Sequence, residues 1–204
     1  MAITKNDELN NLRSIPFDKY FGDMIISPAD KRKRIRLAKK FESFFIDMLY
    51  LLATLTSNDL YDLGFVEAEY YQKILGLFDE PLDLSQREHL RKLVKDVAEV
   101  TLKHTEEPYY TSNDRARFIA ENEANTICNY EEYKEAIILG KTQKTWITML
   151  DNRVRLSHEF VENETLPIDE PFIVGTSQMM FPKDTSLGAS AEEIVNCRCS
   201  IIYE

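Results

Sequence analysis

Two cysteines near the end of the chain, Cys197 and Cys199, have side chains suited to chemistry. They are one residue apart, so a strand over residues 194–203 would place both thiols on the same face. Thiols fixed in this way bridge each other poorly. They suit a soft metal ion, or burial as small apolar groups. A spacing of one residue is tighter than that of most zinc motifs, which favours burial.

His158 is the residue that could turn this pair into a metal site. Zinc takes about four ligands, so the two thiols and His158 would need a fourth, such as Asp151 or Asp169. We favour the alternative, in which the thiols are core residues and the histidine is structural. In both cases we predict that residues 197–199 return to pack beside the segment that carries His158, where a buried Arg155 would pair with Asp151, Asp169 or Asp184.

A second candidate site is a set of polar residues that includes the same histidine: Thr148, Asp151, Arg155 and His158. Their spacing of three, four and three residues would line one face of a helix, with Asp151 and Arg155 as an ion pair in the favourable order. Such a group could activate water or hold phosphate. The sequence contains no glycine-rich phosphate loop and no second histidine nearby. We therefore favour a structural polar network and assign no catalytic residue.

The first half of the chain must position these groups from helices. Apolar residues recur there at three- and four-residue steps, which is the helical period. Helices are expected over residues 27–57 and 66–78, and a third follows a Ser85-x-x-Glu88 capping box. A fourth runs from residue 112 to 139, where Gly140 ends it.

After Gly140 the pattern changes to short segments separated by proline and glycine. Strands are expected over residues 144–148, 172–174 and 194–203, and Trp146 is expected to anchor a core. The fold class is therefore α+β, with a helical N-terminal half followed by a small α+β unit. We divide the chain into a helical docking region, residues 1–110, and a C-terminal domain, residues 111–204.

Charge limits the functions open to the chain. The 204 residues carry a formal net charge of −10, which makes general nucleic-acid binding unfavourable. One basic cluster lies between Lys31 and Lys40, and a helix there would expose Arg32, Lys33, Arg36 and Lys40. This cluster is either a solvated face or a contact for an acidic partner or, weakly, for DNA. No apolar run approaches the roughly 20 residues of a membrane span, and the three cysteines favour a reducing compartment.

The second half also resembles a known family. The ordered string runs from Trp146 through Asp151, Arg155 and His158 to Cys197-Arg198-Cys199. It resembles the phage Mu F-like minor head proteins, also called the phage head morphogenesis family, over residue 112 to the C-terminus. The chain has Ile-Ala-Glu-Asn-Glu at residues 119–123, where such proteins often have Ile-Ala-Arg-Thr-Glu.

The resemblance implies a minor capsid protein of a tailed phage that is found in the virion and, during assembly, in the host cytoplasm. Its partners would be the portal protein and also a scaffold or major capsid protein, and it would have a role in DNA packaging or ejection. The resemblance implies no enzymatic activity, no association with a membrane and no required cofactor. The alternative function is a metal-dependent hydrolase or phage-encoded toxin that uses the Asp/Arg/His and Cys-x-Cys residues. A third possible function is a DNA-binding module based on the basic cluster, which the net charge disfavours.

Overall fold

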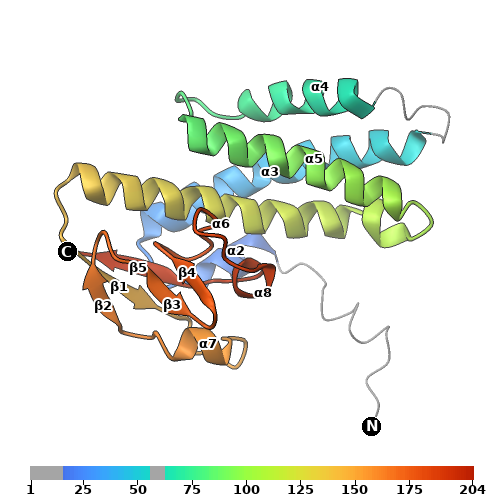
Figure 1. Cartoon of the computed structure of the whole chain (residues 1–204). Helices are drawn as coiled ribbons and strands as arrows, with labels where there is room; N and C mark the ends of the chain where they lie inside the picture. Colours follow the sequence, from blue (N-terminus) through green and yellow to red (C-terminus); the bar gives the residue numbers. More distant parts are fainter. Residues whose placement is uncertain (1–15, 56–62) are drawn as a thin grey trace, which may run out of the picture. The chain divides into compact units, whose positions relative to one another are not determined.

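A computed structural model describes residues 16–55 and 63–204 and has the expected α+β composition, with helices first and small sheets last (Figure 1). The helices are α2 (Phe17–Gly22), α3 (Pro28–Thr54), α4 (Leu63–Leu75), α5 (Leu84–Lys103), η2 (Pro108–Thr111), α6 (Asn113–Ile138), α7 (Leu156–Glu159) and α8 (Ala191–Ile194). The strands are β1 (Gln143–Ile147), β2 (Thr165–Pro167), β3 (Phe172–Val174), β4 (Ser177–Met179) and β5 (Ser200–Tyr203). No helix in these described ranges combines the length and apolarity that a membrane span requires.

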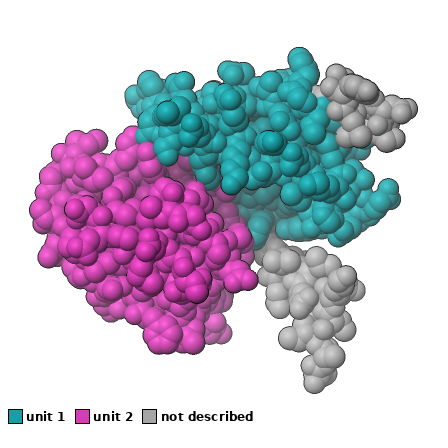
Figure 2. Space-filling view, viewed as in Figure 1, with its two compact units in different colours: residues 1–15, 37–120 teal, residues 16–36, 121–204 magenta. Residues whose placement is uncertain are grey.

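The chain forms two compact units, each of which has its own buried residues (Figure 2). The described part of unit 1 comprises residues 37–55 and 63–120, and unit 2 comprises residues 16–36 and 121–204. The helices α3 and α6 each contribute residues to both units. These bounds differ from the predicted regions 1–110 and 111–204, because residues 16–36 pack with the C-terminal part of the chain. That the chain divides into two domains at residue 110 stays a prediction.

Unit 1 is a helical assembly with an aromatic core. From α3 it buries Phe41, Phe45 and Met48, as the helical period predicted. The Phe44 ring meets that of Tyr70 on α4 edge to face, with 5.6 Å between centroids. In Figure 1, α4 and α5 lie side by side as a helical hairpin.

The start of α5 corrects one sequence prediction. The capping box there is formed by Asp83 and Gln86 rather than by Ser85 and Glu88. The Asp83 carboxylate accepts from the Gln86 amide at 2.9 Å, and the Gln86 side chain accepts from the Asp83 amide at 3.1 Å. The helix therefore begins two residues earlier than the serine suggested, because aspartate is at least as good an N-cap as serine.

Unit 2 contains the strands. A three-stranded antiparallel sheet has the order β2-β1-β5, with Trp146 of β1 opposite Ile201 of β5. The strands β3 and β4 form a separate hairpin whose turn has Gly175 at a φ of 61°, a conformation that glycine adopts without steric cost. Trp146 is fully buried and centres a core of aliphatic, aromatic and thiol side chains, which confirms its predicted role. The predicted strand over residues 194–203 is shorter than expected, because α8 occupies residues 191–194 and β5 begins only at Ser200.

Candidate functional site

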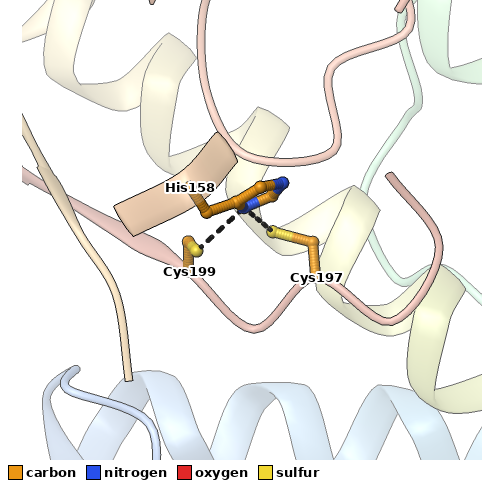
Figure 3. Close-up of side chains that lie close together, drawn as sticks. All are labelled: His158, Cys197 and Cys199. Atoms are coloured by element: carbon orange, nitrogen blue, oxygen red, sulfur yellow. Dashed lines mark hydrogen bonds between the residues drawn. The ribbon is translucent and has the colours of Figure 1, made fainter. Parts of the chain in front are cut away.

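Three buried side chains of unit 2, His158, Cys197 and Cys199, meet at one point (Figure 3). The single turn of α7 carries His158, and the segment between α8 and β5 carries both cysteines. His158 Nδ1 lies 3.3 Å from Cys199 Sγ and 3.6 Å from Cys197 Sγ. The prediction that residues 197–199 return to the histidine segment is therefore confirmed. Cys128 is also buried and is not one of the residues of this cluster.

The other imidazole nitrogen is held by a carboxylate. His158 Nε2 lies 3.0 Å from Glu193 Oε2, and the same oxygen accepts a hydrogen bond from Ser157 Oγ at 2.8 Å. A Cβ added to Gly175 would lie only 2.4 Å from the other Glu193 oxygen, so glycine at this turn leaves room for the carboxylate. With Nε2–H bound to Glu193, Nδ1 is the nitrogen that faces the thiols.

Protons are shared unequally within this cluster. The hydrogen bond from Cys199 lowers the pKa of Cys197 well below its usual value, and His158 adds to this effect against the cost of burial. The same contact with Cys197, together with burial, raises the pKa of Cys199. Burial lowers the pKa of His158, but its hydrogen bond to Cys197 outweighs burial and raises the pKa overall. The two opposite shifts favour the thiolate on Cys197 and the thiol on Cys199.

The polar set from Thr148 to His158 does not line a helical face, which corrects the prediction. Leu150 has a φ of 52°, and the Asp151 carboxylate accepts a hydrogen bond from the Arg153 amide at 3.0 Å. Both features form a turn in place of a helix. Asp151 and Arg155 therefore do not pair.

The two charged residues have other partners. Asp151 Oδ1 accepts a hydrogen bond from the Arg198 guanidinium at 2.8 Å. Arg155 donates to the carbonyl oxygen of Val195, so its predicted pairing with Asp151, Asp169 or Asp184 is wrong. Thr148 is buried, and its amide donates to the Glu162 carboxylate at 2.5 Å. Asp151 and Arg155 both bind the segment around the cysteines, which fits the predicted structural network.

The pair of Asp151 and Arg198 gives a prediction about acid stability. Partial burial raises the pKa of Asp151, but the hydrogen bonds from Arg198 and Arg153 outweigh it and hold the pKa below its usual value. The pair therefore stabilises the folded state at pH values above the pKa of about 3.9 that Asp151 has in the unfolded chain. This contribution is lost as the pH falls through the lower pKa that Asp151 has in the folded state. Because the Asp151 side chain is 37% exposed, Asp151→Asn is expected to lower the free energy of unfolding at pH 7 by only about 0.5–1 kcal/mol.

The measurement is urea unfolding of the wild type and Asp151→Asn at several pH values from neutral to acid. The difference between them should shrink as the pH falls towards about 3. Asp169→Asn is the matched control, because Asp169 is an exposed carboxylate on the same unit. A difference that stays constant down to acid pH would show that the ion pair is not its source.

A ladder of asparagines along α6, which was not predicted from the sequence, holds the cysteine segment. Asn122, Asn125 and Asn129 are buried on one face of this helix. Asn125 Nδ2 donates to the carbonyl of Cys197 at 3.1 Å, and Asn129 Nδ2 donates to Pro182 at 2.8 Å. Their spacing of three and four residues was the available signal, because it places all three on one side of a helix.

A buried lysine completes the support around Asn122. Lys183 Nζ donates to Asn122 Oδ1 at 2.7 Å and to the Ile194 carbonyl at 2.8 Å. The same Asn122 oxygen accepts from the amide of Asn196 at 2.8 Å, the residue before Cys197. Both Lys183 and Asn196 have a positive φ, 72° and 59°. These contacts fix the turn that places the Cys197 thiol beside His158.

The basic cluster on α3 is divided between solvent and interior. Arg32 and Arg36 are exposed, and neither forms an ion pair with any residue in the described part of the chain. Lys33 is exposed but bridges Glu131 at 2.9 Å, and Lys40 is half-buried and donates to the Leu77 carbonyl at 2.7 Å. Arg34, by contrast, is completely buried. The predicted basic face is therefore reduced to Arg32, Arg36 and, in part, Lys33.

Comparison with known proteins agrees with the resemblance seen in the sequence. The family described as Phage Mu protein F like protein matches residues 85–202. The match includes every residue of the His158 cluster and begins upstream of residue 112, within α5. No curated protein and no solved structure matches the chain. Because the match covers more than half of the sequence, the chain belongs to the phage Mu protein F like family of phage head morphogenesis proteins.

Proposed function

We propose that this chain is a non-enzymatic minor component of a tailed-phage head that docks near the portal. The observation that carries the proposal is the family match over residues 85–202, which contains the residues around His158. The proposal places the protein in the virion and, during assembly, in the host cytoplasm. Its partners are the portal protein together with scaffold or major capsid protein, and it assists DNA packaging or ejection.

The arrangement of the site supports a structural role over hydrolysis. The cavity beside His158 has a volume of about 10 Å³, which is room for about one water molecule. Asp151 and Arg155, the charged residues of the hydrolase alternative, are both bound to the segment around the cysteines. The His158 side chain is only 2% exposed, so a phosphodiester or peptide substrate could not reach the imidazole without displacing the segment around the cysteines.

The start of α3 supplies the docking surface in this proposal. Arg32 and Arg36 are four residues apart, so their guanidinium groups project from the same side of the helix. Both are exposed and free of ion pairs with the described residues, whereas the chain as a whole carries a net charge of −10. An isolated basic patch on an acidic protein directs association towards an acidic partner surface, and it allows only weak contact with DNA.

Charge reversal of this patch tests the docking step. The double variant Arg32→Glu/Arg36→Glu is expected to slow association with the portal protein by about tenfold at low salt. The free energy of unfolding should change by only about 0.5 kcal/mol for each substitution, because both side chains are exposed. The measurements are association rates on immobilised portal protein at two salt concentrations, and mass spectrometry of the variant's content in purified heads. Lys33 is less suitable because reversal would also break its ion pair with Glu131.

The double variant Lys92→Glu/Lys141→Glu is the matched control. It makes the same change in net charge at two other exposed lysines and should bind portal protein and enter heads normally. Equal rates and equal incorporation for wild type, test variant and control would reject the docking surface. Absence of the wild-type protein from heads would reject the proposed function as a whole.

A further inference from the structure

We propose that His158, Cys197 and Cys199 bind one zinc ion through Nδ1 and the two sulfurs, with a water molecule as the fourth ligand. This inference goes beyond the proposed function and does not depend on it. A zinc site would hold whether or not the chain docks on a portal.

The distances within the cluster fit such an ion. Zinc bonds of about 2.3 Å to sulfur and about 2.0 Å to nitrogen in a tetrahedron place nitrogen and sulfur roughly 3.6 Å apart and the two sulfurs roughly 3.8 Å apart. The observed distances from His158 Nδ1 are 3.6 Å to Cys197 and 3.3 Å to Cys199, and all three ligand atoms lie within 4.8 Å of one another. The two nitrogen–sulfur distances therefore need to change by no more than a few tenths of an ångström to accept the ion.

Glu193 provides the support that a ligating histidine requires. A metal-bound imidazole usually donates its other N–H to a carboxylate, which fixes the ring and its tautomer. Glu193 Oε2 is 3.0 Å from His158 Nε2 and is itself held by Ser157 at 2.8 Å. The lone pair of Nδ1 is thereby available to an ion placed between the sulfurs. Glu193 is a positioning residue and not a ligand.

The cavity next to the cluster supplies the fourth position. It is lined by His158 and both cysteines and holds about 10 Å³, or about one water molecule. Arg153, Arg155 and Arg198 also line it, and the ion itself would deprotonate the thiols that coordinate it. Two thiolates, one imidazole and a water are a ligand set that zinc accepts.

The ion would join two parts of the chain that are distant in sequence. It would tie the single turn of α7 to the segment between α8 and β5, where both cysteines lie. So short a helix has little stability of its own. Metal binding would thus stabilise this end of unit 2 directly, since the free energy of binding adds to that of folding.

The test uses the full chain, reduced and stripped of metal, with Co²⁺ as the spectroscopic probe and Zn²⁺ as the competitor. We expect a thiolate-to-cobalt absorption band that saturates at one ion per chain and disappears when zinc is added. Zinc should also raise the melting temperature, and a chelator should reverse that rise. Glu193→Gln should still bind one ion, but about tenfold more weakly, because the neutral amide supports the imidazole less well.

Cysteine variants assign the ligands. Cys197→Ser and Cys199→Ser should each lose or strongly weaken the band, whereas Cys128→Ala, the matched control, should keep it because Cys128 lies outside the cluster. The proposal is wrong if the wild type shows no saturable thiolate band, or if Cys197→Ser binds cobalt as the wild type does. If the serine variants fail to fold, the wild-type titration and Glu193→Gln still decide the question.

Discussion

Arg34→Met is expected to lower the free energy of unfolding by about 3–5 kcal/mol, the usual cost of removing one partner of a buried charged pair. The Arg34 guanidinium is completely buried. It binds both carboxylate oxygens of Glu132, at 2.5 and 2.9 Å, and the side-chain oxygens of Asn125 and Asn129, at 2.9 and 2.7 Å. Methionine fills much of the space but leaves these acceptors without a donor, and one of them carries a charge.

Urea unfolding of the full chain measures this effect. Arg36→Met on the same helix is the matched control, and because that side chain is exposed it should change stability by no more than about 0.5 kcal/mol. Arg34→Lys should recover only part of the loss, since an ammonium group cannot bind the carboxylate with two parallel hydrogen bonds. A loss below about 1 kcal/mol for Arg34→Met would mean that solvent reaches Glu132 readily in the variant.

Trp146→Ala is the second large effect, with an expected loss of about 3–5 kcal/mol. The indole is fully buried and makes edge-on contacts with the Phe172 ring, at 5.2 Å between centroids, and with the His158 ring, at 5.7 Å. Truncation would leave a large cavity at the centre of unit 2. Because the cavity adjoins His158, the variant should also loosen the cysteine cluster, which alkylation rates of the thiols under native conditions would report.

Trp146→Phe separates packing from the loss of the indole N–H. The Nε1 atom is among the buried atoms without a hydrogen-bond partner in the described part of the chain. Its removal loses at most the weak interaction of the indole with the Cys199 thiol, and the phenyl ring keeps most of the apolar contact. We expect a loss of about 1–2 kcal/mol, well below that of alanine. Equal losses for both variants would show that the core cannot adapt to the smaller ring.

The helices were predictable because their pattern is local. The apolar residues Phe41, Phe45 and Met48 repeat at the helical period and are all buried. Gly140 follows α6 with a φ of 70°, as its predicted end required. The capping box at Asp83 was missed because a serine two residues later offered a competing signal. Such a choice between neighbouring caps depends on a few tenths of a kilocalorie and is not visible in the sequence pattern.

Only those contacts of the candidate site were predictable in which a polar side chain needs a second polar group beside it. The meeting of His158 with Cys197 and Cys199 was expected because each group is better satisfied beside the other, and the structure confirms it. The helix proposed through Asp151 was wrong because its carboxylate bonds the backbone two residues ahead and forms a turn. The aspartate-asparagine pair at this point was the overlooked signal.

The asparagine ladder and Arg34 could not be found from local patterns. Polar residues at helical spacing, such as Asn122 and Asn125, usually indicate a solvated face. Here the partners are the Cys197 carbonyl and a lysine from a distant loop, Lys183. Likewise, Arg34 lies among six other basic residues between Lys31 and Lys40, and nothing in its immediate neighbours shows that it alone is buried. Only long-range pairing distinguishes these residues from their neighbours.

The discontinuous composition of unit 2 has a consequence for protein synthesis. Residues 16–36 leave the ribosome before the whole of residues 37–120, yet their partners lie in residues 121–204. Arg34 is separated from Asn125 by 91 positions, a delay of roughly 5–18 seconds at about 5–20 residues per second. During that interval a guanidinium that ends fully buried remains hydrated, and the aromatic residues of α2 have no completed core. Nascent chains that stall before residue 121 would therefore display this unfinished surface to chaperones and proteases, while the helices of residues 37–120 could already have folded.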